Sequence, residues 1–245
     1  MKTGASICVV LLLCWESYLV STARSAFAEV APELAAGLSA RDRGDIESLR
    51  KLIETAQSEA RQKSNAESWQ KVAQLDQWLT EAAQLHDDEK SIKGAAQDGL
   101  SAAEKAVTLN PASSEARRLL GDLLGEMIPH TFMGGMRLGK RAASELDKAI
   151  QLEPRNANAH VGRAIGYYFT PSAFGGSHQK AADLLKKAIE IDPGNDTARI
   201  WLAQVYLSDG RHDDAAREIA EALRINPDRA FAKHVQQLIL TRNRK

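Results

Sequence analysis

Residues 184–227 read LLKKAIEIDPGNDTARIWLAQVYLSDGRHDDAAREIAEALRINP, and this stretch decides the fold. Pro193 and Pro227 lie 34 residues apart. Between them, apolar and small residues recur at the three- and four-residue spacing of amphipathic helices: Leu202, Ala203, Tyr206, Ala215, Ile219 and Ala222. Gly210 interrupts the pattern as a turn would, and each proline ends a helix because it lacks the amide hydrogen. The stretch therefore predicts two antiparallel helices whose small residues permit close packing.

Three more prolines end similar segments, which indicates an internal repeat. An amphipathic segment with an alanine five residues before its proline precedes each of Pro111, Pro154, Pro193 and Pro227. Successive prolines are 43, 39 and 34 residues apart. Because the helices keep their register relative to the flanking prolines, we expect the extra residues between the two helices of a pair, in the segments 127–141 and 169–180. A long loop is expected within residues 64–111 as well.

A 34-residue helix pair with these positions resembles the tetratricopeptide repeat family. The resemblance implies an all-α fold, a right-handed α-solenoid of antiparallel helix pairs with long loops inside the repeats. The predicted organisation is a signal peptide at 1–28, a degenerate N-terminal helix pair at 29–63, repeats at 64–111, 112–154, 155–193 and 194–227, and a C-terminal capping helix with a tail at 228–245.

The middle of the chain is also similar to two narrower families. A helix led by Trp69, a long loop inside a repeat and a glycine-containing loop after a proline-ended helix resemble the helical domain of the regulator of microtubule dynamics family and its bacterial periplasmic relatives. The T component of tripartite periplasmic (TRAP) transporters is another exported helical-repeat family with a similar look. Both resemblances imply a non-enzymatic binding or scaffold protein, and neither identifies a ligand.

The first 28 residues have the pattern of a secretory signal peptide. Lys2 supplies a positive charge, residues 7–13 are apolar, and Ala26-Phe27-Ala28 fits a cleavage site. We expect cleavage after Ala28 and a periplasmic or secreted protein. An uncleaved segment acting as a membrane anchor stays open, and membrane contact is expected only through it. Both cysteines, Cys8 and Cys14, lie in this segment, so the mature protein would contain no disulfide.

Composition and motif spacing exclude several functional classes. The chain has 32 Lys and Arg residues against 32 Asp and Glu, which argues against a nucleic-acid-binding protein. The segment from Gly134 to Lys140 is spelled like a phosphate-binding loop, but Arg141 stands where that motif has Ser or Thr, and no strand pattern precedes it. The six histidines are not spaced as a metal site, and no catalytic constellation stands out. We therefore expect no enzyme, no metal and no cofactor.

The first helix of each repeat is expected to face a groove that binds a protein or peptide partner. By register, the groove-facing residues are Trp78, Arg118, Asp122, Val161, Ile165, Tyr168, Phe169, Ile200, Gln204 and Leu207. They include no Lys/Asn cluster that would clamp a terminal carboxylate, so an apolar or mixed peptide, or a partner helix, fits better. The other interpretation is that Tyr168, Phe169 and Leu207 pack against the inserted loops.

The two inserted loops share a spelling, an aromatic residue followed by paired glycines after a proline. The residues concerned are Phe132, Gly134 and Gly135 in the first loop and Phe174, Gly175 and Gly176 in the second. Insertions in repeats often carry binding, so the loops are candidates for partner contact. Equally, the phenylalanines could fill the groove while the glycines supply a positive φ.

The function expected from the sequence is a periplasmic scaffold that binds a protein partner through its groove and inserted loops. The alternative is a solute-binding accessory subunit of a periplasmic, TRAP-type transport system, with a polar pocket ringed by Arg118, Arg163 and Tyr168. The sequence leaves the partner, the pathway and the existence of a homo-oligomer open.

Overall fold

The computed structural model describes residues 32–131 and 135–242, which are helical and contain no strand. The chain divides into two compact units, residues 1–36 and 37–245, and of the first unit only 32–36 are described. The α-helices are α2 (Pro32–Arg43), α3 (Ile46–Lys63), α4 (Ala66–Gln84), α5 (Glu89–Leu109), α6 (Ser114–Glu126), α7 (Gly135–Leu152), α8 (Ala157–Phe169), α9 (His178–Ile191), α10 (Asp196–Ser208), α11 (His212–Ile225) and α12 (Ala230–Arg242), with a short 3-10 helix η1 at Ser172–Phe174. The predicted all-α solenoid is confirmed.

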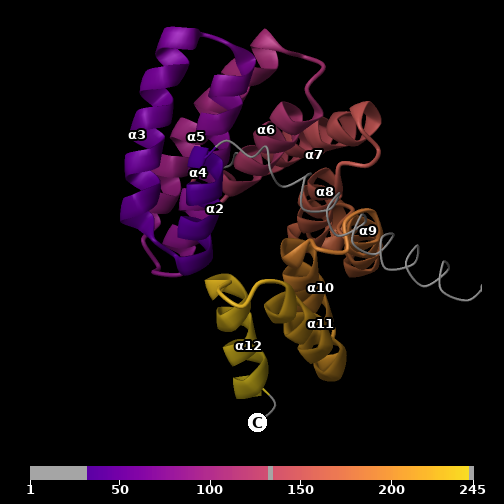
Figure 1. The fold of residues 1–245 in the computed structure, drawn as a ribbon. Coiled ribbons are helices and arrows are strands. Elements are labelled where there is room, and N and C mark those ends of the chain that lie inside the picture. The colour runs from indigo at the N-terminus through magenta and orange to yellow at the C-terminus, as the bar shows by residue number, and fades with distance from the viewer. Residues whose placement is uncertain (1–31, 132–134, 243–245) are drawn as a thin grey trace, which may run out of the picture. The chain divides into compact units, whose positions relative to one another are not determined.

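Consecutive helices pack as antiparallel pairs, and the pairs stack on one another (Figure 1). α4 pairs with α5, α6 with α7, α8 with α9 and α10 with α11, and α12 packs on α10 and α11. The first helix of each pair also contacts the first helix of the next, in the order α4, α6, α8, α10, α12. We call these five helices the first-helix row. Side chains on neighbouring members of this row can therefore form one continuous surface.

Small residues permit this close packing. Alanines recur in the buried faces of most pairs, among them Ala103, Ala149 and Ala203, each fully buried. A Cβ atom built on Gly121 would lie 2.6 Å from Cγ of Leu146, and one on Gly162 would collide with the carboxylate of Asp122. Glycine at these two positions lets α6 approach α7 and α8 approach α6.

Three repeats begin at a side-chain N-cap two residues after a proline. Ser113, Asn156 and Asn195 follow Pro111, Pro154 and Pro193, and each side-chain oxygen accepts a hydrogen bond from the amide three residues later. These residues satisfy an amide that the helix itself leaves without a partner. Proline and cap together fix where the first helix of the repeat starts.

Two expectations about loops are wrong. Residues 64–111 contain no long loop, because α4 and α5 are 19 and 21 residues long and only residues 85–88 join them. The expected loop at 127–141 is also too long, because α7 begins at Gly135 and residues 135–141 are helix. Good helix formers dominate both segments, and Gly139 lies in the interior of α7 without breaking it.

The predicted signal peptide, residues 1–28, lies outside the described residues. Within residues 32–131 and 135–242, each helix is too short or too polar to cross a membrane.

Candidate functional site

Four aromatic side chains from three helices of the first-helix row form a connected cluster. Tyr168 and Phe169 end α8, Trp201 lies on α10 and Phe231 on α12. The ring centroids of Phe169 and Trp201 are 5.8 Å apart, those of Tyr168 and Trp201 are 6.2 Å apart, and those of Trp201 and Phe231 are 6.0 Å apart. We call these four residues the aromatic strip. Its spacings are those of favourable edge-to-face and tilted aromatic pairs.

Polar contacts fix the orientation of Tyr168 in this strip. The hydroxyl of Tyr168 lies 2.7 Å from Oγ of Ser208 on α10. His178, the first residue of α9, stacks on the Tyr168 ring at 5.2 Å, and its Nδ1 atom lies 2.6 Å from a carboxylate oxygen of Asp209. A ring held at both its edge and its face loses little conformational freedom when a ligand contacts it.

The aromatic strip is accessible at one end. Phe169 is 66% exposed, whereas Tyr168, Trp201 and Phe231 are half-buried and pack against the core of the last repeats. The ring of Trp201 is thus supported by the core and lies beside the exposed ring of Phe169. A rigid aromatic group flanked by an exposed aromatic group is typical of residues that dominate binding energy at protein interfaces.

The loop after α8 places a further aromatic residue at the surface. Phe174 in η1 is 71% exposed and therefore does not fill a groove. Gly175 has a φ of +94°, and a Cβ on Gly176 would collide with the carbonyl oxygen of Thr170. Both glycines are thus required by the path of the loop back to α9. In the corresponding first loop, Phe132 and Gly134 lie outside the described residues, and Gly135 is the first residue of α7.

The N-terminal part of the first-helix row has a largely buried polar network centred on Arg118. Its guanidinium donates hydrogen bonds to Glu115 and Asp122 on α6 and to Gln74 and Gln77 on α4, at 2.6–3.1 Å. Gln77 donates in turn to Asp122 at 2.9 Å. The amides of α4 and the charged groups of α6 therefore form one network between neighbouring repeats.

Burial changes the titration of this network. Desolvation raises the pKa of the Asp122 carboxyl to about 6, although Arg118 and Gln77 favour its ionised form. Burial also opposes the charge of Arg118, but Glu115 and Asp122 raise the pKa of its guanidinium overall. Arg118 is consequently a fixed charge at neutral pH, whose hydrogen-bonding donors are already occupied by protein groups.

The structure separates the residues expected in the groove into three groups. Val161, Ile200 and Leu207 are buried in the apolar core, with 4%, 0% and 7% exposure. Trp78, Arg118, Asp122, Ile165 and Gln204 are buried or half-buried, and Arg41 lies over the Trp78 ring. Tyr168 and Phe169 belong to the aromatic strip, and Phe169 is exposed. Partner contact at all of these positions stays a prediction.

Sequence reasoning did not identify Trp201, Phe231 or His178 as members of the site. The signal for Trp201 was present, because Thr197, Trp201, Gln204 and Ser208 follow helical spacing along one face of α10. Phe231 lies in the capping helix, and His178 reaches Tyr168 across a loop, so their proximity depends on tertiary packing.

The described residues show no arrangement that indicates metal or phosphate chemistry. In 32–131 and 135–242, no group of three or more His, Cys, Asp or Glu side chains is placed to hold a metal ion. The segment that resembles a phosphate-binding loop is, from Gly135 onward, the start of α7.

Comparison with known proteins identifies the repeat. Residues 175–238 match the model of the tetratricopeptide repeat family. A TPR protein of Thermus thermophilus is similar in structure, with a TM-score of 0.61 and 23% identity over 85% of this chain and 97% of that one. This likeness shows the fold. No curated protein sequence matches the chain.

Two further solved structures are more distantly similar. YrrB, described as a TPR protein with an unusual peptide-binding site, has a TM-score of 0.45 and 18% identity over 79% of this chain and 93% of its own. MamA from Desulfovibrio magneticus has a TM-score of 0.44 and 16% identity over 82% of this chain and 98% of its own.

Proposed function

We propose that this tetratricopeptide repeat array is a non-enzymatic scaffold that binds a peptide segment of a partner protein across the aromatic strip. The observation that carries the proposal is the exposed ring of Phe169 beside the supported ring of Trp201, 5.8 Å away. An apolar or aromatic side chain of the partner would pack on the exposed surface of these two rings. The surface is presented by packed helices, so little conformational entropy opposes binding.

The surroundings of the strip favour a peptide of mixed character. Arg163 stacks on the ring of Tyr167 at 4.1 Å and is paired with Asp147. Ser208 and Asp209 add a hydroxyl and a carboxylate beside Tyr168 and His178. An apolar centre with polar groups at its edge is the usual composition of an interface that forms and dissociates.

The solute-binding alternative is less well supported. Arg118 is bound by Glu115, Asp122 and two glutamines, and Arg163 is bound by Asp147. These two arginines are therefore engaged by protein groups and not directed together toward a small ligand. For this reason we retain the protein-binding scaffold as the proposed function.

We further propose that the scaffold acts in the periplasm or outside the cell. The support is the signal-peptide pattern of residues 1–28, with cleavage after Ala28. Detection of a mature N-terminus at Glu29 in an exported fraction is the expected result. A full-length protein retained in the cytosol would contradict the proposal for location, and it would leave the proposal for binding unaffected.

Site-specific photo-crosslinking tests the binding surface directly. A benzophenone amino acid replaces Phe169 in one version of the protein and Leu152 in another. Leu152 is a matched control, because it is 46% exposed and lies at the end of α7. We expect a discrete crosslinked partner from position 169 and none from position 152. The same products from both positions, or none from position 169 when the partner is bound, would contradict the proposal.

A further inference from the structure

Arg229 is buried completely although it is charged and precedes a helix. Its side chain is 0% exposed, and α12 begins at the next residue. Its guanidinium forms a two-pronged ion pair with Glu81 of α4, with one Nη–O distance of 3.0 Å, and its Nε atom lies 3.3 Å from a carboxylate oxygen of Asp196 on α10. Asp42 of α2 lies 3.8 Å from the same Nε atom.

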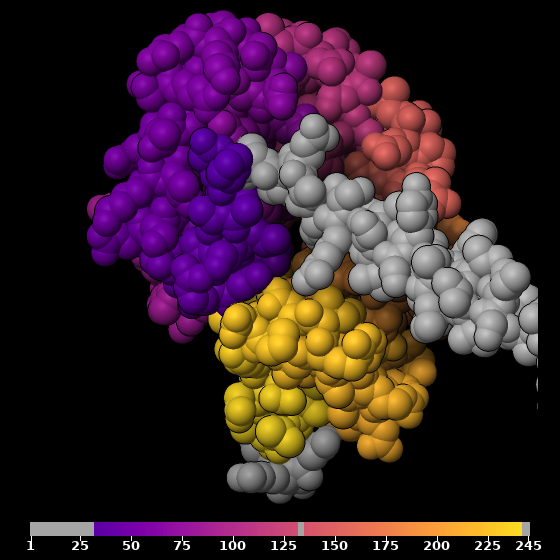
Figure 2. Space-filling model, viewed as in Figure 1, coloured from indigo at the N-terminus to yellow at the C-terminus, as the bar shows by residue number. Residues whose placement is uncertain are grey.

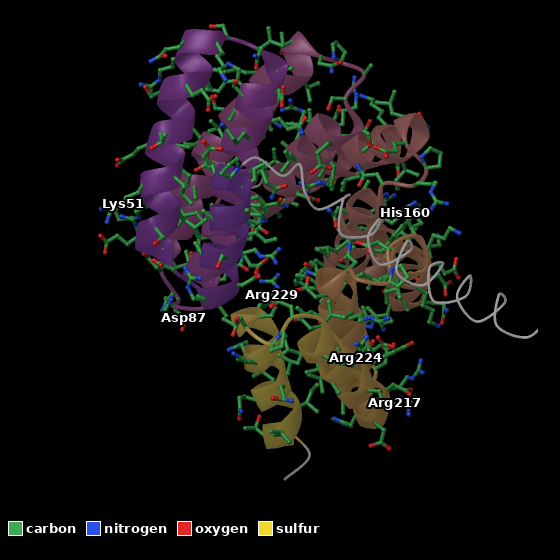
Figure 3. All side chains as sticks on the ribbon, viewed as in Figure 1. Lys51, Asp87, His160, Arg217, Arg224 and Arg229 are labelled. Atoms are coloured by element: carbon green, nitrogen blue, oxygen red, sulfur yellow. The ribbon has the colours of Figure 1, made fainter. Side chains whose placement is uncertain are left out.

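Asn226 strengthens this cluster. Its amide donates to Asp42 at 2.9 Å and to Asp196 at 3.0 Å. Arg41 neutralises part of the acidic charge, because it pairs with Asp42 at 2.6 Å. Carboxylates from three helices, α2, α4 and α10, thus converge on the guanidinium of Arg229, which Figure 3 labels beside the start of α12. The two Nη atoms are hydrogen-bonded to Glu81, whereas Nε has carboxylates nearby but no hydrogen-bond partner. A buried arginine is tolerated when its charge is paired with carboxylates in this way.

The repeat pattern is broken at this position. Ser113, Asn156 and Asn195 stand two residues after the prolines of the preceding repeats, where they cap the first helix, and Arg229 stands two residues after Pro227. A positive charge at the N-terminus of a helix opposes the helix dipole and supplies no acceptor for the free amides. An arginine at this capping position is therefore expected only where another requirement outweighs the capping of the helix.

The ion pair of Arg229 with Glu81 also differs from the contacts usually found in a repeat array. In such arrays each repeat normally touches only its neighbours, so that the ends of the array do not influence each other. Arg229 and Glu81 are 148 residues apart in sequence, and α5 to α11 lie between them along the chain. Figure 2 shows the C-terminal segment, in yellow, against the indigo and violet N-terminal segment.

We propose that the cluster of Arg229 with Asp42, Glu81 and Asp196 is a latch that closes the helical array on itself and whose release opens the surface carrying the aromatic strip. Phe231 links the two features, because it lies two residues after Arg229 and contacts Trp201. When the latch is closed, α12 holds Phe231 against Trp201 within the strip. When the latch is released, the residues that lead into α12 are free to move away from Glu81 on α4 and Asp42 on α2. The latch does not depend on the identity of a partner.

Distance measurements between spin labels test the latch. In the full chain, with Cys8 and Cys14 changed to serine, labels are attached at exposed positions through Glu54→Cys on α3 and Gln237→Cys on α12. Pulsed electron paramagnetic resonance should give a narrow distance distribution for the closed array. We expect Arg229→Met to broaden this distribution and shift it to longer distances.

Two further variants make the test decisive. Arg224→Met is the matched control, because Arg224 is an exposed arginine on α11 that pairs with Glu221, and it should leave the distribution unchanged (Figure 3). Glu81→Gln removes the charge but keeps the side-chain volume and one acceptor. If Arg229→Met reduces helicity, Glu81→Gln therefore still tests whether the ion pair holds the array closed. We expect it to broaden the distribution and to speed amide exchange in the first turn of α12 on the order of tenfold. An unchanged distance distribution in Glu81→Gln would overturn the latch.

Discussion

Gly94 and Gly176 differ in the space around them, so replacing each by alanine should change the stability of the protein in opposite directions. Gly94 lies inside α5 with no atom within 4 Å of a built Cβ, whereas a Cβ on Gly176 would collide with the carbonyl of Thr170. We expect Gly94→Ala to stabilise the protein by about 0.5–1 kcal/mol, because alanine favours the helix. Gly176→Ala should destabilise it by about 1–3 kcal/mol, because the loop must move. Urea unfolding followed by circular dichroism measures both, and an equal effect of the two changes would contradict this description of the loop.

Asp76 should make stability depend on pH. Its side chain is buried at 2% exposure, its Oδ2 atom has no hydrogen-bond partner, and desolvation with a contribution from Asp98 raises its pKa from 3.8 to about 8. Between these values the folded state holds a proton that the unfolded state has released, so stability falls as the pH rises from about 4 to about 8.

The variant Asp76→Asn removes this titration. Relative to it, the wild type should lose several kcal/mol across that pH range, since each unit of pKa shift corresponds to about 1.4 kcal/mol. Unfolding free energies at pH 5, 6.5 and 8 measure the difference. Parallel pH profiles of the two proteins would show that Asp76 does not titrate as described.

At the scale of residues, the sequence placed Tyr168 and Phe169 among the candidate groove residues, but it did not predict which side chains surround them. Helical register alone did not separate Ile200 and Leu207, which are buried, from Trp201, which is half-buried at the surface. Neighbouring positions on a helix differ in exposure according to what the next repeat places against them. Arg229 carried a signal in sequence, because it replaces Ser or Asn at the capping position, but its acidic partners come from distant helices.

At the scale of elements, the caps that start the repeats should contribute measurably to stability. Asn195 accepts a hydrogen bond from the amide of Ala198 and donates one to Asn158 on α8 at 2.9 Å. It therefore both starts α10 and links it to the preceding repeat. Asn195→Ala should destabilise the protein by about 1–2 kcal/mol, through the lost cap and the lost contact.

Asn110 supplies a control for that change. It follows α5 and lies before Pro111, is exposed, and accepts from the amide of Ala112. Asn110→Ala should cost clearly less than Asn195→Ala in the same thermal or urea unfolding experiment. A larger loss from Asn110→Ala would mean that the caps do not hold the repeats in this way.

Helix boundaries could be predicted where the sequence supplies breakers. Pro193, Gly210 and Pro227 enclose α10 and α11 as expected, and Gly210 has a φ of +73°. Residues 64–110 and 135–141 contain no proline. A fixed repeat length predicted loops in these two segments, but helix continues through most of the first and all of the second. Propensity outweighed periodicity in these two places.

At the scale of the whole molecule, the contact between distant repeats should make unfolding cooperative. Trp69 and Trp78 report on the N-terminal repeats and Trp201 on the last one. In versions that keep Trp78 or Trp201 as the sole tryptophan, urea transitions should coincide, because the Arg229 cluster connects the two regions. Arg229→Met should separate the two midpoints, as expected of an array with neighbour contacts only. Separate midpoints in the wild-type protein would contradict this coupling.

The affinity of the crosslinked partner segment for three versions of the protein tests the central claim most directly. Calorimetric titration would compare the wild type with Phe169→Ala and with the control Leu152→Ala, both of which change exposed side chains and should leave the fold intact. The aromatic strip predicts an affinity about tenfold or more lower for Phe169→Ala, as for other exposed aromatic anchors, and an unchanged affinity for Leu152→Ala. Equal affinities for the wild type and Phe169→Ala would show that the partner binds elsewhere.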